Sequence, residues 1–176
     1  MGQLKIGING FGRIGRNAFK IAFERSDIEI VAINDLTDTK TLAYLLKHDS
    51  NYGTYRHDVD FNDSEIIVGG RNVKVLAEKD PAALPWGDLG VDLVIESTGR
   101  FTAKEDAELH ITAGAKRVVI SGPSKSEEVD TIVLGANEDT IEGASHVISN
   151  ASCTTNSLGA LMEILDAEFG VEKSLL

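Results

Sequence analysis

Short runs of aliphatic residues alternate with a helical pattern at the start of the chain. The segments Leu4–Asn9 (LKIGIN) and Ile28–Asn34 (IEIVAIN) are rich in aliphatic residues, as is typical of strands buried on both faces of a parallel sheet. Between them, residues 13–25 carry apolar side chains at helical spacing, namely Ile14, Ala18, Ile21 and Ala22. The pattern therefore predicts a strand, a helix and a second parallel strand, which together form a β-α-β unit.

The pattern changes after the second strand. Residues 39–47 (TKTLAYLLK) predict a helix, and residues 48–54 predict a polar loop. Residues 55–78 contain three short strand candidates, YRHDVDF, EIIV and NVKVLAE, the last two of which are joined around a Gly-Gly pair. This spacing favours an antiparallel hairpin or meander inserted into the fold.

Strands and helices alternate again in the second half. The runs DLVIE, RVVIS, TIVLG and HVIS predict strands at residues 92–96, 117–121, 131–135 and 146–149, with a helix at residues 103–113. A last helix over residues 152–169 is ended by Gly170, and residues 171–176 have the pattern of a beginning strand. The apolar face of this last helix consists of Leu158, Leu161, Met162 and Leu165. The expected fold class is α/β, with an open, doubly wound, mostly parallel sheet.

Composition and charge narrow the class of protein and of partner. The 176 residues suffice for one ordinary domain with a sizeable core. The formal net charge of −11 argues against nucleic acid and anionic membrane surfaces as partners, because both are repelled. No apolar run reaches the roughly 18 residues of a membrane span, and no signal-peptide core follows Met1, so we expect a cytoplasmic protein. The single cysteine permits no intramolecular disulfide.

A dinucleotide-binding pattern follows the first predicted strand. Gly10, Gly12 and Gly15 form a G-x-G-x-x-G sequence between a strand and a helix. The glycines allow a tight turn, close approach of the backbone to a pyrophosphate and close packing of the helix on the strand, while free N–H groups at the helix start bind phosphates. The second strand ends at Asp35, 20 residues beyond Gly15, where a carboxylate accepts hydrogen bonds from ribose hydroxyls. The alternative is a simple βα turn in which Asp35 only caps a loop.

The neighbourhood of Asp35 favours NAD over NADP. No basic residue follows Asp35 before Lys40, so a 2′-phosphate would meet a negative charge without a partner. The ends of later strands supply further candidates for the cofactor cleft, because ligands bind beyond the carboxyl ends of the strands in a doubly wound sheet. These candidates lie at residues 96–101 (ESTGRF) and 121–123 (SGP), and the alternative is that they are ordinary turn residues.

The only cysteine lies in the first turn of the last predicted helix. The helix dipole and the unpaired N–H groups there favour the thiolate form of Cys153, which is the reactive form. Ser152 is a natural N-cap, Thr154 offers a hydroxyl, and Asn156 is placed to brace the preceding loop. Local chemistry alone leaves two interpretations equally open, a nucleophile or a small buried core residue.

The histidines do not complete a catalytic pair in the sequence. A nucleophilic cysteine needs a base within hydrogen-bond reach, and His146 lies seven residues upstream of Cys153 along an extended strand. His48 and His57 flank a polar loop and His110 lies within a helix, so none of the four is favoured as the base. No pair has metal-ligand spacing with Cys153, and we expect no metal site.

Four segments together carry a family resemblance. With INGFGRIGR at residues 8–16, NDL at 34–36, ESTGRF at 96–101 and SNASCTTN at 149–156, the chain resembles glyceraldehyde-3-phosphate dehydrogenase over essentially its whole length. The resemblance implies a Rossmann-type domain that binds NAD, and a glycolytic oxidoreductase that converts glyceraldehyde 3-phosphate and inorganic phosphate into 1,3-bisphosphoglycerate. It also implies that the motif cysteine attacks the aldehyde and forms a thioester.

The resemblance assigns roles to individual residues. The backbone at Arg13 and Ile14 corresponds to the site of the NAD pyrophosphate, and Asp35 to that of the adenosine ribose. The residues that match family positions around the adenine and nicotinamide ends are Lys79, Thr98, Gly99 and Ser121. By the same resemblance Cys153 is the nucleophile, and Ser152 and Thr154 help to hold the attacking phosphate.

Length is where the chain departs from the family. The resemblance divides it into an NAD-binding domain at residues 1–151 and the start of a catalytic domain at residues 152–176. Family members continue for about as long again and carry there the histidine that activates the cysteine. We therefore expect weak NAD binding, a tendency to associate and little turnover from these 176 residues alone, although the full-length family is usually homotetrameric. Other open interpretations are a nonenzymatic NAD-binding module, half of a split protein, or erythrose-4-phosphate dehydrogenase.

Overall fold

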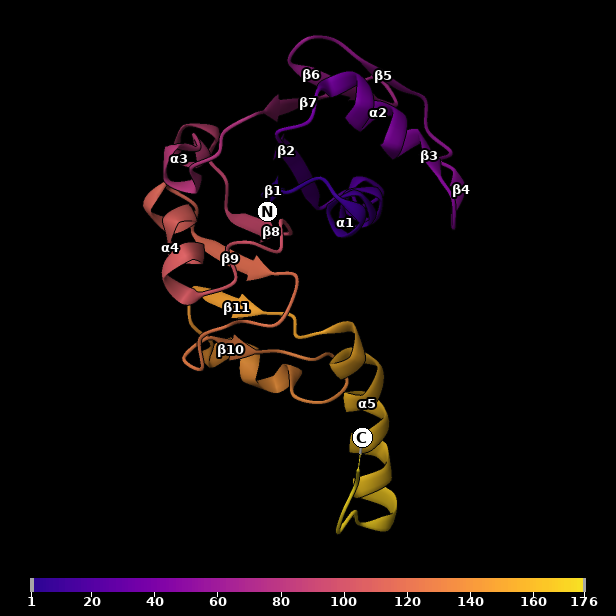
Figure 1. The fold of residues 1–176 in the computed structure, drawn as a ribbon, viewed down its shortest axis with the longest axis vertical. Helices are drawn as coiled ribbons and strands as arrows, with labels where there is room; N and C mark the ends of the chain where they lie inside the picture. The colour runs from indigo at the N-terminus through magenta and orange to yellow at the C-terminus, as the bar shows by residue number, and fades with distance from the viewer. Residues whose placement is uncertain (1, 176) are drawn as a thin grey trace.

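The computed structural model describes residues 2–175, which form one large sheet flanked by helices (Figure 1). The strands of this sheet are β1 (Leu4–Asn9), β2 (Ile28–Asn34), β5 (Val59–Phe61), β6 (Glu65–Val68), β7 (Arg71–Leu76), β8 (Leu93–Glu96), β9 (Arg117–Ile120), β10 (Asp130–Thr131) and β11 (Val147–Ser149). The α-helices are α1 (Arg13–Phe23), α2 (Thr39–Lys47), α3 (Trp86–Leu89), α4 (Lys104–Thr112) and α5 (Cys153–Phe169). Two 3-10 helices, η1 (Pro81–Ala83) and η2 (Glu138–Gly143), lie in the connections.

The strand order confirms the doubly wound fold. Neighbouring strands follow the order β10-β11-β9-β8-β1-β2-β7-β6-β5, and every pair from β10 to β7 is parallel. The chain leaves β1 towards β2 and later returns to the other side of β1 with β8. The order therefore reverses between β1 and β8, which is where open α/β sheets bind their ligands.

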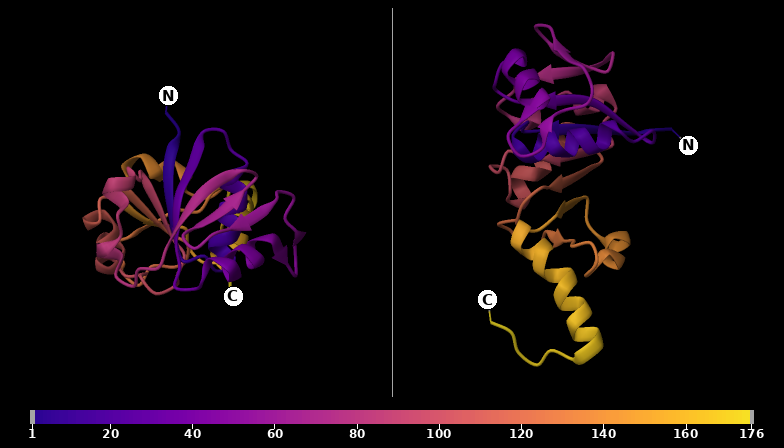
Figure 2. Two further views of the ribbon diagram at one scale, coloured as in Figure 1. Left: turned by 90° about the horizontal axis from the view of Figure 1, so that it is seen from above. Right: turned by 90° about the vertical axis from the view of Figure 1, so that its right-hand side faces the viewer.

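Helices cover both faces of the sheet and define two cores (Figure 2). On one face, α1 and α2 contribute Phe19 and Leu46, which pack with Ile8 of β1. On the other face, Trp86 of α3 and Ala107 of α4 pack in a cluster with strand residues of β8 and β9. Because strands between two helical layers are buried on both sides, their continuous aliphatic runs follow from the architecture.

The antiparallel insertion is also confirmed. β5 pairs with β6, and β6 with β7, both antiparallel, while β7 joins the parallel sheet beside β2. Residues 48–54, expected as a loop, instead contain a small separate hairpin of β3 (His48–Asp49) and β4 (Gly53–Thr54). Asp49 makes this turn possible, because its carboxylate accepts the backbone N–H groups of Asn51 and Tyr52.

Two strand predictions near the end of the chain were wrong. The strand expected at residues 131–135 is reduced to β10, because the Asn137 side chain accepts the Val133 N–H and donates to the Thr131 carbonyl, turning the chain towards η2. No strand forms within residues 171–175, where the Val171 N–H is instead donated to the side chain of Asp166. In each segment a side chain accepts a backbone N–H that a strand would donate to its neighbour.

Helix α5 extends away from the body of the sheet (Figures 1 and 2). None of its residues is buried, and its apolar side chains include Leu161, Ile164 and Phe169, which are 52%, 60% and 81% exposed. Of the face predicted from the sequence, Leu161 is exposed and the other three side chains are half-buried. Within residues 2–175, no helix combines the length and apolar character that crossing a membrane requires.

Candidate nucleotide-binding and nucleophile site

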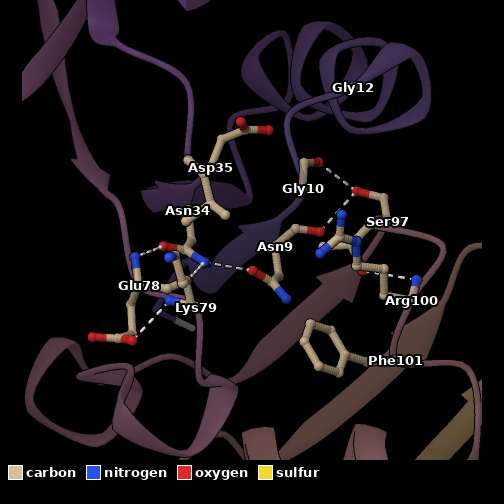
Figure 3. A pocket seen from close by; sticks show the side chains of 12 residues that line it. Asn9, Gly10, Gly12, Asn34, Asp35, Glu78, Lys79, Ser97, Arg100 and Phe101 are labelled. Carbon is tan, nitrogen blue, oxygen red and sulfur yellow. Dashed lines mark hydrogen bonds between the residues drawn. The ribbon is translucent and has the colours of Figure 1, made fainter.

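A cavity of about 650 Å³ opens at the edge of the sheet where the strand order reverses (Figure 3). Its volume lies within the range of small-molecule and cofactor pockets. The lining comes from the last residues of β1 and β2 and from the segments that follow β1, β2, β7 and β8: Asn9, Gly10, Gly12, Asn34, Asp35, Leu36, Glu78, Lys79, Ser97, Thr98, Arg100 and Phe101. The wall of the cavity is thus built at the carboxyl ends of four parallel strands.

The three motif glycines have different surroundings. Gly10 has φ of +90°, and a Cβ there would lie 2.6 Å from the backbone nitrogen of Thr98. A Cβ on Gly15 would overlap the carbonyl oxygen of Gly10. A Cβ on Gly12, in contrast, would meet no atom within 4 Å. The protein's own packing therefore requires Gly10 and Gly15, whereas Gly12 leaves open a space that borders the cavity.

The N-terminus of α1 supplies hydrogen-bond donors beside that space. Gly12 is the N-cap, and no side chain caps the helix. The first N–H groups of the helix, at Arg13 and Ile14, therefore have no intrahelical acceptor and stand at the positive end of the helix dipole. The Arg13 side chain is directed elsewhere, because its guanidinium lies 3.7 Å from the Asp49 carboxylate. An anion at this turn would therefore be bound by backbone N–H groups and not by the Arg13 side chain.

Asp35 is held in place at the end of β2. One carboxylate oxygen accepts the backbone N–H of Phe11 at 2.8 Å, and the other accepts the N–H of Thr37 at 3.0 Å. Each oxygen has a second acceptor position. The carboxylate therefore ties the glycine turn to the second strand and can still accept hydroxyl donors from the cavity.

A ladder of amides forms the floor of the cavity (Figure 3). Asn34 donates through Nδ2 to Asn9 Oδ1 at 2.7 Å, and accepts the Glu78 N–H on Oδ1 at 2.8 Å. The side chain of Glu78 in turn accepts the backbone N–H of Lys79. These bonds fix the segment after β7 against the ends of β1 and β2, which brings Lys79 to the cavity wall.

The residues after β8 divide between the cavity and its surroundings. Ser97 donates to the Gly10 carbonyl at 2.7 Å, and Thr98 lines the cavity next to it. Gly99, with φ of +72°, allows the turn that follows, but neither Gly99 nor Ser121 is among the lining residues. Arg100 and Phe101 do line the cavity. Of the three positions inferred on this side of the sheet, the structure therefore brings only Thr98 into the cavity wall.

The cysteine loop has the local structure expected from its sequence. Ser152 is the N-cap of α5, and its Oγ accepts the Thr155 N–H at 3.0 Å. Asn156 donates through Nδ2 to the Asn150 carbonyl at 2.7 Å, which braces the loop. Cys153 is exposed as the first residue of the helix, and this exposure excludes a role as a small core residue among the residues described. β11 brings this helix start to the same edge of the sheet as the cavity, because parallel strands end on one edge.

Sequence comparison assigns the family. The model of the glyceraldehyde 3-phosphate dehydrogenase NAD binding domain matches residues 4–104. The chain belongs to the glyceraldehyde-3-phosphate dehydrogenase family. Its similar relatives include glyceraldehyde-3-phosphate dehydrogenase 1 of Bacillus cereus at 53% identity, and the enzymes named glyceraldehyde-3-phosphate dehydrogenase from Geobacillus stearothermophilus at 53% and Thermotoga maritima at 52%.

The matches to these glyceraldehyde-3-phosphate dehydrogenases cover 98% of this chain and 52% of each relative. The chain thus spans about half the length of the curated relatives. The resemblance to the family and the expectation of an NAD-binding domain in an oxidoreductase lineage are confirmed. The open space at Gly12, the uncapped start of α1 and the carboxylate of Asp35 are the features of this chain that fit a dinucleotide.

One buried hydrogen-bonded cluster was missed by reasoning from the sequence. His110, assigned only to a helix, is fully buried and bonded to Glu96 and to Trp86. Within the described residues, no group of three or more histidine, cysteine, aspartate or glutamate side chains is arranged to hold a metal ion. Glu96 begins the candidate segment at residues 96–101, but its contact with a histidine on a distant helix is not visible in the sequence, and only the packing reveals the cluster.

Proposed function

We propose that this chain supplies the NAD site and the nucleophile of a phosphorylating, NAD-dependent glyceraldehyde-3-phosphate dehydrogenase. The observation that carries the proposal is the common sheet edge shared by the 650 Å³ cavity and the exposed Cys153 at the start of α5. In this proposal residues 1–151 form the NAD-binding domain, and residues 152–176 begin a catalytic domain.

The cofactor is proposed to lie along the ends of β1, β2 and β8. The backbone N–H groups of Arg13 and Ile14 hold the pyrophosphate beside Gly12, where a side chain would obstruct it. Asp35 accepts the ribose hydroxyls and, as a carboxylate, disfavours a 2′-phosphate. The residues proposed to surround the adenine and nicotinamide ends are Lys79, Thr98, Gly99 and Ser121, and of these Lys79 and Thr98 line the cavity.

Cys153 is proposed to carry the chemistry. Its thiolate attacks the aldehyde carbon of glyceraldehyde 3-phosphate, forming a C–S bond and a thiohemiacetal. NAD, when bound in the cavity, would supply the acceptor for the hydride that leaves this carbon. Loss of the hydroxyl proton to a base leaves a thioester on Cys153. Inorganic phosphate, held with the help of Ser152 and Thr154, then attacks the thioester carbon, the C–S bond breaks, and the thiolate is restored as 1,3-bisphosphoglycerate leaves.

The base is proposed to come from the portion of the family fold that these 176 residues do not include. Two of the chain's own histidines are unsuited by position, because His110 is fully buried and His57 packs with Tyr55 beside Phe23, at the C-terminal end of α1. His146 is exposed just before β11, but that strand separates it from the cysteine loop.

The test measures NAD binding and turnover separately. NAD and NADP are titrated into the 176-residue chain by calorimetry, and NADH formation is followed with glyceraldehyde 3-phosphate and phosphate. The turnover assay is run alone and after addition of the remaining portion of the Geobacillus stearothermophilus relative. We expect saturable binding of NAD and turnover in the mixture that Cys153→Ser abolishes.

Two results decide against the proposal. Saturable NAD binding with no turnover in a correctly folded mixture supports a nonenzymatic NAD-binding module instead. Absence of NAD binding by the folded chain contradicts the assignment of the cavity itself.

A further inference from the structure

A line of buried side chains lies behind the cofactor cavity and on the opposite face of the sheet from α1. The side chains of His110 on α4 and Glu96 at the end of β8 are both 0% exposed, and Trp86 on α3 is also fully buried. Neither His110 nor Trp86 lines the cavity. Burial of ionisable groups is costly unless each is hydrogen-bonded, so a cluster of this kind has a defined bonding pattern.

The direction of each hydrogen bond follows from the Trp86 indole. Its Nε1–H can only donate, and it lies 3.0 Å from His110 Nδ1. That ring nitrogen must therefore accept, and the imidazole proton is on Nε2, which donates to Glu96 Oε2 at 2.9 Å. Trp86 thus selects one tautomer of His110, and the selected tautomer presents a donor to the carboxylate.

Glu96 receives donors on all sides. On Oε2 it accepts from His110 and from Asn9 Nδ2, the latter at 2.6 Å, and on Oε1 it accepts the N–H of Thr98 at 2.8 Å and the Thr98 hydroxyl. Four donors therefore approach the two oxygens of this carboxyl group, two on each oxygen. The approach of Asn9 Nδ2 to His110 Nε2 at 3.4 Å is therefore that of two donors converging on one oxygen.

The bonding pattern continues across the cavity floor. Because Asn9 presents its amide nitrogen to Glu96, its Oδ1 faces β2 and accepts from Asn34. The orientation of the Asn34 amide then matches the backbone of Glu78. Its Oδ1 accepts the Glu78 N–H, and its Nδ2 donates to the Glu78 carbonyl. If the side-chain amide of Asn9 or of Asn34 were reversed, its N–H₂ group would face another donor. The orientations of the two amides therefore depend on one another and on Glu96.

We infer that His110 and Trp86 are positioning residues for the cofactor cavity. They orient Glu96, which sets the Thr98 loop on one wall and, through Asn9 and Asn34, the Glu78–Lys79 segment on the other. The inference rests on the proposed binding of NAD at this cavity. Neither His110 nor Trp86 lines the cavity. The inference states that loss of their hydrogen bonds weakens NAD binding more than an equally buried packing change does.

A matched pair of variants at His110 tests the inference. His110→Gln keeps an amide that can donate to Glu96 and accept from Trp86, whereas His110→Leu removes both bonds at similar volume. Val118→Ala serves as the control, because Val118 is buried in the same core cluster and has only an apolar side chain. The three variants and Trp86→Phe are made in the 176-residue chain.

The first measurement is the NAD dissociation constant by calorimetry. If the energy of a lost hydrogen bond is transmitted in full to the cavity, a bond to a charged group corresponds to about a tenfold weaker affinity for NAD and a neutral bond to about threefold. We expect about tenfold weaker binding for His110→Leu, about threefold for Trp86→Phe, and affinities near that of the parent chain for His110→Gln and Val118→Ala. Equal affinities in His110→Leu and Val118→Ala would overturn the inference.

The second measurement needs no cofactor. Nitrogen-15 NMR reports the His110 tautomer, and hydrogen exchange reports the Thr98 amide that Glu96 accepts. We expect a single Nε2-protonated tautomer in the parent chain, a mixture in Trp86→Phe, and faster Thr98 exchange in His110→Leu than in His110→Gln. If the parent chain fails to bind NAD, the proposed function fails, and these two readouts still decide the positioning role. An unchanged tautomer and unchanged Thr98 exchange contradict it.

Discussion

The Asp35 carboxylate accepts the backbone N–H of Phe11 at 2.8 Å, so the residue proposed to bind ribose also fastens the glycine turn to β2. Asp35→Asn replaces one oxygen by an N–H₂ group, which opposes either the Phe11 N–H or the N–H of Thr37. We expect NAD affinity to fall about tenfold, as for loss of a charge-assisted hydrogen bond. NADP affinity should fall less, because the charge that repels a 2′-phosphate is removed.

Parallel titrations of NAD and NADP check this result. Asp38→Asn is the matched control, because Asp38 caps α2 through the Thr41 N–H and does not line the cavity. Equal losses for the two cofactors would count against a role of Asp35 in discrimination.

Two glycines of the same motif should respond differently to the same substitution. Gly15→Ala places a methyl group against the Gly10 carbonyl, and the overpacking should destabilise the fold by roughly 1–3 kcal/mol. Gly12→Ala places it in open space, so thermal stability should change little while NAD affinity falls at least about tenfold. Thermal melts and NAD titrations of both variants separate the two effects. A stable Gly15→Ala chain, or a Gly12→Ala chain with full affinity, contradicts this account of the motif.

Among the described residues, one non-glycine residue has a positive φ, and it lies in the loop before Cys153. Ala151 has φ of +58° and is buried, immediately before the N-cap Ser152. Ala151→Val should destabilise the chain by about 1–2 kcal/mol, since a β-branched residue is a genuine outlier at positive φ. Ala151→Gly should be close to neutral, because relief of the backbone conformation offsets the greater freedom of the unfolded chain. Denaturant unfolding of the two variants measures the difference, and similar midpoints would refute the prediction.

Acid should weaken the hydrogen bonds of the Asp92 carboxylate, which connects the starts of β1, β8 and β9. The Lys116 ammonium and the backbone N–H of Lys5 bond the Asp92 carboxylate and lower its pKa. A carboxyl whose pKa is lower in the folded chain stabilises it above the ordinary value of about 3.9 and loses that effect as the pH falls through the folded-state pKa. Asp92→Asn should therefore show a smaller loss of stability than the parent chain between neutral and acid pH.

Urea unfolding at a series of pH values tests this dependence. Asp63→Asn is the control, because Asp63 is exposed in the loop between β5 and β6. The same acid dependence in Asp92→Asn and in the parent chain would show that the charge of the Asp92 carboxylate contributes nothing measurable, as is common for exposed ion pairs.

Much of the fold and of the candidate site could be predicted from local sequence patterns. The aliphatic runs at β1 and β2, the glycine spacing and the acid at Asp35 all act within one β-α-β unit, so their meaning can be read from neighbours in sequence. The N-cap at Ser152 and the brace at Asn156 are likewise contacts within a few residues. Beyond β10, the Asn137 side chain accepts a backbone N–H that a longer strand would donate to its neighbour. The aliphatic pattern does not show this competition, so it predicted too long a strand.

The amino-acid sequence by itself determined the doubly wound class, the position of the dinucleotide motif and the place of the thiol at a helix start, because each depends on periodicity or on contacts along the chain. Only the tertiary structure decided that Trp86, His110 and Glu96 form one buried hydrogen-bonded line behind the cavity. These residues lie on α3, α4 and β8, and their sequence positions do not reveal that they meet. Their burial, and hence the need for each donor to find its acceptor, arises only when two helices pack on one face of the sheet.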